Sequence, residues 1–156
     1  MAGGSARQVD PLPAAEGPDL EGLLGYNLKR AYVTVRDDFR RVLGEGGLSP
    51  GAFSALSLTV ESPGVTSSEL ARRLGIERSG LVAIVDDLQR RGYLTREGVP
   101  GDRRVQALQP TPEGTEAQAA TLAAVRASEA ALTAGFTDEE RETLLGLLVR
   151  LRGRED

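Results

Sequence analysis

Residues 66–104 read TSSELARRLGIERSGLVAIVDDLQRRGYLTREGVPGDRR, and this stretch decides the fold. Thr66 and Glu69 have the spacing of a capping box, in which a hydroxyl and a carboxylate satisfy free N–H groups at a helix start. The box predicts a short helix over 69–74, closed by the glycine that follows. A longer helix is expected over about 78–91, because apolar residues recur there at helical spacing: Leu81, Ile84, Val85 and Leu88.

After Gly92 the period of the apolar residues changes from about 3.6 to 2, which is typical of β-strands. Residues 93–96 and 105–108 are therefore expected to form short strands, joined through 97–102 as a hairpin with a flexible tip. No other β-structure is expected. Helix, short helix, turn, helix and hairpin is the element order of a winged helix-turn-helix.

Amphipathic segments flank this stretch on both sides. A helix is expected over about 20–43 with Asp19 as its N-cap, and Ser49-Pro50 begins a second helix that runs to about Glu61. On the other side, Thr111-Pro112 begins one helix, and a second capping box begins the last one at Thr137-Asp138-Glu139-Glu140.

Together these elements predict a mainly α fold: a winged helix-turn-helix with long N- and C-terminal dimerisation helices and one β-hairpin wing. The winged part spans about 48–110 and the dimerisation helices about 20–44 and 112–152, within a single domain over 19–156. The leucine-rich faces of the outer helices favour association, and covering the winged core of one chain is their alternative role. Residues 1–18, rich in glycine and proline, are expected to form a disordered tail.

The composition excludes most catalytic and metal chemistry. The 156-residue chain has no cysteine and no histidine, and Lys29 is its single lysine. It therefore lacks thiolate nucleophiles, serine–histidine catalysis and the preferred zinc ligands, and we expect neither an enzyme nor a metal or cofactor site. No apolar run is long enough to cross a bilayer and the first residues lack the pattern of a secretory signal, so we expect a cytoplasmic protein.

Basic charge is concentrated in the winged segment. The net charge of the chain is -4, yet residues 72–104 contain eight arginines and five acidic residues, a local charge of +3 that leaves -7 for the rest. A basic region on an acidic protein favours contact with nucleic acid.

Two helix starts carry the expected DNA contacts of the helical part. Arg78 and Ser79 begin the longer helix, where they can reach base edges in the major groove, and Val82 is the third expected contact on that helix. Ser67 and Ser68, at the start of the short helix, suit a phosphate contact. A solvated first turn and helix capping are the alternative roles of these residues.

The hairpin adds a further expected contact. Asp102-Arg103-Arg104 places two arginines beside a glycine-rich tip, where one guanidinium can enter the minor groove and Asp102 can orient an arginine. The triplet does not indicate whether Arg103 or Arg104 enters the groove. Exposed charge is the alternative role of such a triplet when it stands alone.

Several motifs in the segment 48–114 together resemble the MarR family of bacterial transcription regulators. The resemblance covers about residues 20–152. Two positions depart from the family pattern, Glu77 where aspartate is frequent and Pro110 where leucine is common, and neither is an expected DNA contact. The motifs are Ser68-Glu69-Leu70-Ala71, Leu74-Gly75-Ile76, Val85-Asp86-Asp87-Leu88, Arg91-Gly92-Tyr93-Leu94, Arg96, Asp102-Arg103-Arg104 and Thr111-Pro112-Glu113-Gly114.

The resemblance implies a homodimer whose first and last helices interdigitate, and a twofold dimer would read a pseudo-palindromic operator in double-stranded DNA. It also implies a small-molecule effector, bound between the dimer helices and the DNA-binding lobe, that weakens DNA binding. Because thiol and zinc sensing need cysteine or histidine, an organic effector such as an aromatic acid or its thioester is expected. Core packing and surface solvation are the alternative roles of the residues expected to line its pocket: Tyr26, Arg30, Tyr32, Arg36 and Phe53.

The expected function is therefore a sequence-specific regulator of transcription, acting as a repressor that an organic effector releases. The alternative is a winged-helix module that contacts other proteins and binds no specific DNA. A small enzyme is a weaker third hypothesis, because no acid, base and nucleophile converge in the sequence.

Overall fold

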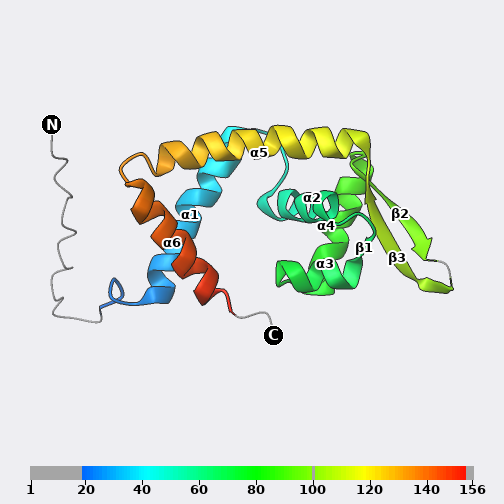
Figure 1. The fold of residues 1–156 in the computed structure, drawn as a ribbon, viewed down its shortest axis with the longest axis horizontal. Helices are drawn as coiled ribbons and strands as arrows, with labels where there is room; N and C mark the ends of the chain where they lie inside the picture. The colour runs from blue at the N-terminus through cyan, green and yellow to red at the C-terminus, as the bar shows by residue number, and fades with distance from the viewer. Residues whose placement is uncertain (1–18, 100, 154–156) are drawn as a thin grey trace. The chain divides into compact units, whose positions relative to one another are not determined.

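The computed structural model describes residues 19–99 and 101–153, and of residues 102–104 it describes the backbone alone. The expected tail, 1–18, lies outside the described residues. The chain forms two compact units, and the boundary between them lies within the first helix, between Thr34 and Val35. The elements in chain order are α1 (Leu24–Leu43), α2 (Pro50–Glu61), β1 (Val65–Thr66), α3 (Ser67–Leu74), α4 (Arg78–Arg90), β2 (Leu94–Val99), β3 (Asp102–Pro110), α5 (Pro112–Leu132) and α6 (Asp138–Leu151) (Figure 1).

Side-chain caps fix the starts of three helices where the sequence predicts them. The Ser49 hydroxyl accepts a hydrogen bond from the backbone N–H of Ala52 at 3.1 Å, with proline next at the first helical position of α2. Thr111 caps α5 in the same way. At α6 both halves of the predicted capping box are present between Thr137 and Glu140. Local chemistry therefore determines these boundaries.

The predicted start of α1 is wrong by about four residues. Asp19 does not cap the helix, because its carboxylate accepts a hydrogen bond from the N–H of Gly22 at 2.9 Å and closes a separate turn. The helix begins at Leu24. The amide of Asn27 donates back to the carbonyl oxygens of Glu21 and Leu23, at 2.6 and 3.0 Å, and so joins this turn to the helix.

The start of α3 is also corrected. Thr66 caps it as predicted, accepting from the N–H of Glu69 at 3.2 Å, but the helix already begins at Ser67. The second half of the capping box does not form, because the Glu69 carboxylate instead accepts two hydrogen bonds from the Arg72 guanidinium, at 3.0 and 2.8 Å. Gly75 ends the helix with a φ of 65°, as its position predicts.

The sheet has three antiparallel strands in the order β1-β3-β2, so the prediction that the hairpin is the sole β-structure is wrong. Val65 and Thr66 pair with Leu108 and Ala107. A two-residue strand shows no alternation in sequence, and its hydrogen bonds come from residues more than 40 positions away. The chain reaches this pairing through Gly64, whose φ of 87° lies in the left-handed region.

The hairpin is longer than predicted, because residues 97–99 and 102–104 belong to the strands rather than to a flexible tip. The ladder continues through Glu97 opposite Ala107 and Gly98 opposite Gln106, with a register shift at Gly98 and Val99. β2 thus ends at Val99 and β3 begins at Asp102.

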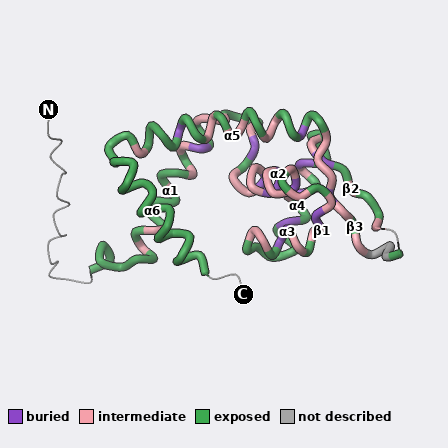
Figure 2. Tube along the Cα trace, viewed as in Figure 1, coloured by how far each residue is buried: buried purple, intermediate pink, exposed green. Residues whose placement is uncertain are grey.

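The core lies between α2, α3, α4 and the sheet (Figures 1 and 2). Each fully buried leucine contributes about 1.5–3 kcal/mol relative to an exposed one. This cluster holds α4 in place at its buried face and leaves its opposite face exposed. The largest fully buried side chains are Leu56, Leu70, Leu81, Leu88, Leu94, Leu108, Val85 and Thr59.

α5 begins in close contact with the chain that enters the wing. A Cβ on Gly114 would lie 1.9 Å from the carbonyl oxygen of Tyr93, so no side chain fits there. The Thr111 hydroxyl donates to the carbonyl of Gly92 at 2.6 Å, and its N–H donates to Tyr93 at 3.1 Å. The first turn of α5 is therefore fixed against the base of the wing.

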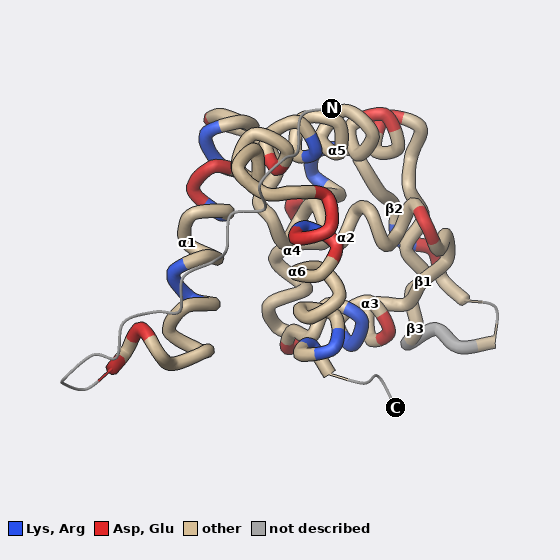
Figure 3. The backbone as a smooth tube through the Cα atoms, turned by 60° about the vertical axis from the view of Figure 1, so that its left-hand side comes forward, with Lys and Arg blue, Asp and Glu red and all other residues tan. Residues whose placement is uncertain are grey.

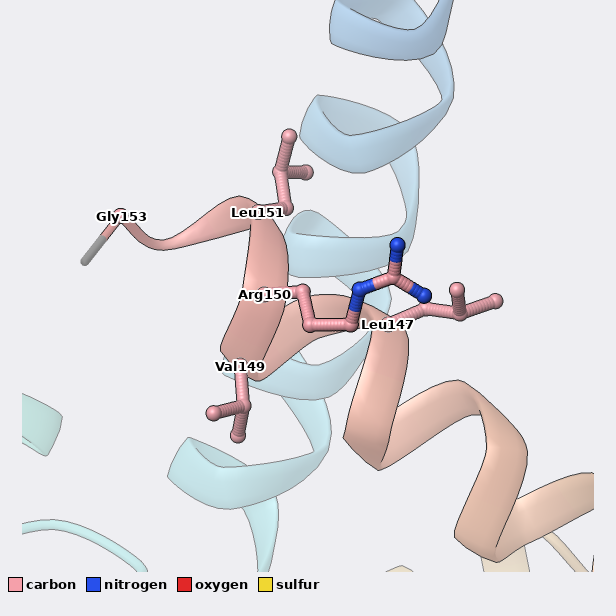
Figure 4. A pocket seen from close by; sticks show the side chains of 5 residues that line it. All are labelled: Leu147, Val149, Arg150, Leu151 and Gly153. Carbon is pink, nitrogen blue, oxygen red and sulfur yellow. The ribbon is translucent and has the colours of Figure 1, made fainter.

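α6 leaves its apolar side chains exposed. None of its residues is buried, and Leu145 and Leu147 are more than half exposed. Leu147, Val149 and Leu151 project from the end of α6 around a pocket of about 830 Å³ (Figure 4). Yet none of the helices among the described residues is long and apolar enough to cross a membrane. An exposed leucine-rich face on a folded chain favours association with another protein surface.

Candidate nucleic-acid interface

A groove of about 520 Å³ lies where α3, α4 and the strands of the wing come together. It brings together four of the residues predicted to contact DNA: Ser67 and Ser68 from α3, and Arg78 and Val82 from α4. The residues that line it are Thr66, Ser67, Ser68, Arg78, Leu81, Val82, Val85, Arg96, Val105 and Gln106.

The two serines occupy the first turn of α3. Ser67 is half-buried and Ser68 is exposed, both directly after the cap at Thr66. The first N–H groups of a helix have no acceptor within it, and they attract anions. This end of α3 therefore presents donors at the rim of the groove.

The first turn of α4 is exposed at Arg78, Ser79 and Gly80. Glu77 occupies the N-cap position and makes no side-chain cap hydrogen bond, which agrees with its being a poorer cap than aspartate. The structure shows no ion pair of Arg78 among the described residues. Val82, one turn further on, is 55% exposed. Ser79 belongs to the same turn but is not part of the groove lining.

Six lining residues are not among the predicted contacts, and Arg96 and Gln106 are the two of them that carry long polar side chains. Arg96 on β2 pairs with Asp86 on α4, with 2.5 Å between Nη2 and Oδ1. Alternation along the strand could have indicated Arg96, because it shares the inner face with buried Leu94 and an arginine there needs an acidic partner. For Gln106, opposite Gly98 on the neighbouring strand, the sequence contains no such indication.

The predicted wing contacts lie outside the described side chains. The backbone of residues 102–104 belongs to β3, and Asp102 pairs with Val99 on β2. The roles of Arg103 and Arg104 and the orienting role of Asp102 remain predictions.

Much of the basic charge around the groove is neutralised locally. Figure 3 shows basic and acidic residues near one another on α3, and Arg72 and Glu69 form one such pair at 2.8 Å. The side-chain hydrogen bond from Arg72, together with the charges of Arg72 and Arg73, lowers the pKa of Glu69 below its ordinary value. Arg73 contacts the Ser62 hydroxyl at 2.9 Å. Because Arg72 and Arg73 on α3 already have partners, Arg78 at the start of α4 is the arginine best placed to contact an external anion.

The residues expected to line an effector pocket belong to both compact units. Tyr26, Arg30 and Tyr32 lie in the first unit, and Arg36 and Phe53 lie in the second. Arg36 pairs with the neighbouring Asp37 at 2.8 Å. Phe53 packs against Phe39, with 6.0 Å between the ring centroids. The ion pair joins neighbours on α1 and the ring contact joins α1 to α2, and the pocket itself remains a prediction.

The carboxylates of the described residues do not come together as a metal site. Among residues 19–99 and 101–153, no three carboxylates come together in a way that could hold a metal ion. The groove offers hydrogen-bond donors, apolar contact and two arginines, of which Arg96 is paired with Asp86.

Comparison with known proteins identifies the family. The MarR family profile matches residues 46–105. A Thauera aromatica protein named for the transcriptional regulation of the hcr operon is 35% identical over 133 residues, which cover 85% of this chain and 80% of that protein. The chain belongs to the MarR family of transcription regulators. The fold and the family predicted from the sequence are thus confirmed.

Solved structures of MarR-type regulators agree over nearly the whole chain. The transcriptional repressor CouR bound to a 23-mer DNA duplex is 36% identical, with a TM-score of 0.82, over 87% of this chain and 96% of that one. CouR bound to p-coumaroyl-CoA is 34% identical, with a TM-score of 0.79, over 89% and 97% of the two chains. A probable transcriptional regulator from Pseudomonas aeruginosa is 30% identical, with a TM-score of 0.78, over 85% and 98%.

Proposed function

We propose that this MarR-family protein is a repressor that binds operator DNA as a homodimer and is released by a small organic effector. The observation that carries the proposal is the groove, where α3, α4 and the strands of the wing meet. The similarity to CouR, solved on a DNA duplex, supports this use of the same elements.

Each part of the interface has a proposed role. α4 lies in the major groove, where Arg78 and Ser79 read base edges and Val82 contacts a thymine methyl group. Ser67 and Ser68 bind a phosphate at the start of α3. In the wing, Arg103 or Arg104 enters the minor groove, and Asp102 orients one of the two arginines.

The dimer is supported by the exposed leucine-rich face of α6. A twofold dimer presents two identical α4 helices to the duplex, so the operator is a pseudo-palindrome with half-sites about 10 bp apart. The protein acts on chromosomal DNA in the cytoplasm and has no catalytic activity of its own.

For the effector, we propose an aromatic acid or its coenzyme A thioester. The similarity to CouR bound to p-coumaroyl-CoA supports this class, and the absence of cysteine and histidine excludes thiol and zinc-thiolate sensing. The proposed lining residues are Tyr26, Arg30, Tyr32, Arg36 and Phe53.

Selection of bound duplexes from a random DNA library tests the function. The purified protein should enrich a pseudo-palindrome and bind it at least about 1,000-fold more tightly than a scrambled duplex, with an affinity that falls steeply with salt. Addition of p-coumaroyl-CoA should weaken binding, whereas coenzyme A alone serves as the control. Equal binding to selected and scrambled duplexes would instead favour the protein-interaction module.

A further inference from the structure

Arg91, directly after α4, connects two parts of the chain that are 45 positions apart. Its Nε donates a hydrogen bond to Oδ2 of Asp87 on α4 at 2.8 Å. Its Nη1 donates to the carbonyl oxygen of Gly46 at 2.7 Å. One guanidinium therefore joins the C-terminal end of α4 to the loop between α1 and α2.

That loop has little stiffness of its own. It reads Gly44-Glu45-Gly46-Gly47, and both Gly44 and Gly46 have a φ in the left-handed region, at 65° and 84°. Glycine-rich segments have many accessible conformations, so a contact from outside is needed to select one of them. Arg91 supplies such a contact, immediately before the chain enters the core at Leu48.

We infer that Arg91 is a positioning residue, which sets the direction of α4 relative to the loop that follows α1. This inference rests on the proposed function, because the direction of α4 in each copy determines the spacing of two recognition helices in a dimer. The role needs the planar fork of arginine, which donates to two acceptors in different directions, and a lysine ammonium is a poor replacement for it.

Arg90 offers a matched control on the same helix. It contacts the same carboxylate, with 3.6 Å between Nη2 and Oδ1 of Asp87, and its side chain is 74% exposed against 30% for Arg91. Replacing Arg90 removes the same charge from the same end of α4 and leaves the hydrogen bond to Gly46 in place.

The first test measures spacing selectivity with the full chain and its Arg91→Ala, Arg91→Lys and Arg90→Ala variants. Each is titrated with the selected operator and with the same operator carrying one extra base pair between the half-sites, which turns one half-site by about 34°. We expect Arg91→Ala to lower the ratio of the two affinities about fivefold and Arg91→Lys to behave similarly. Arg90→Ala should keep the wild-type ratio.

A second measurement does not depend on DNA. Because the chain has no cysteine, a single Gln89→Cys substitution places one spin label on the exposed end of α4 in each copy. The distribution of distances between the two labels should broaden in Arg91→Ala and Arg91→Lys and stay narrow in Arg90→Ala.

The outcomes separate the two proposals. An unchanged affinity ratio and an unchanged distance distribution in Arg91→Ala overturn the positioning role, as do equal changes in Arg90→Ala. A wild-type protein that fails to prefer the selected duplex contradicts the proposed function, while the width of the label distribution still decides the role of Arg91.

Discussion

Arg96 on β2 and Asp86 on α4 form an ion pair with 2.5 Å between Nη2 and Oδ1. The arginine side chain is 26% exposed and the aspartate 50%, and Arg96 also lines the groove. The pair therefore joins the wing to the helix that we place in the major groove.

We expect this pair to stabilise the wing in its DNA-binding position. A double-mutant cycle of Asp86→Asn, Arg96→Ala and the combined variant should give a coupling free energy of about 1 kcal/mol, because a half-exposed pair is partly screened by solvent. Operator affinity and thermal unfolding are the two readouts. Strictly additive losses in both would mean that the contact does not connect wing and helix.

Arg78 is expected to read a base edge. Arg78→Ala should cost about 1–3 kcal/mol at the selected operator and much less on random DNA. Gln89→Ala, at the far end of the same helix, is the control and should bind both duplexes like the wild type. An equal loss on both duplexes would assign Arg78 to a phosphate instead.

The two wing arginines should differ from each other. The arginine that enters the minor groove should lose most affinity as alanine on operators with A·T-rich flanks, where the groove is narrow and its potential most negative. Lysine should hardly rescue that position, because an ammonium is more strongly hydrated than a guanidinium. The other arginine should tolerate lysine. Wild-type affinity for both alanine variants across a salt titration would remove the wing from the interface.

The exposed leucines of α6 should be needed for the dimer. Leu145→Glu combined with Leu148→Glu places two charges in the apolar face and should give a monomer by light scattering at micromolar concentration. Thr143→Glu adds a charge on the opposite side of α6, away from Leu145 and Leu148, and should stay dimeric. A monomeric wild type would contradict the proposal at once.

Glu69 should give α3 a dependence on pH. Its pKa is lowered from the ordinary value of 4.5, chiefly by the hydrogen bond from Arg72, so its contribution to stability is complete above that value and is lost as the pH falls through the lowered pKa. The melting temperature of Glu69→Gln should therefore lie slightly below that of the wild type at pH 7 and approach it as the pH falls through the lowered pKa. A constant difference across this range would contradict the linkage.

The helices were predictable because short-range chemistry marks their ends. Ser49, Thr111 and Thr137 each cap the helix that they were expected to cap. The start of α1 was not predictable, because the apolar pattern extends back to Leu20 while the carboxylate of Asp19 closes a separate turn before the helix. β1 depends on pairing with distant residues, which leaves no local trace in the sequence.

The residues that line the groove likewise divide into those that the sequence predicts and those that it does not. Residues at helix starts, such as Ser68 and Arg78, were predictable from their position relative to the caps. Gln106 was not, because its place in the lining depends on the register between β2 and β3. For Arg96 the alternation along the strand indicates a position on the inner face, where an arginine needs an acidic partner such as Asp86.

The close contact of Gly114 with Tyr93 makes the beginning of α5 the point about which the helix would rotate. α5 has 21 residues, so at 1.5 Å per residue it is an arm about 30 Å long. A rotation of about 5° at this contact shifts the first turn by well under 1 Å and carries the far end, at Leu132, through about 3 Å. The relation also holds in reverse: a displacement of several ångströms at the far end of α5 moves the first turn of the helix, beside the wing, by only a fraction of an ångström.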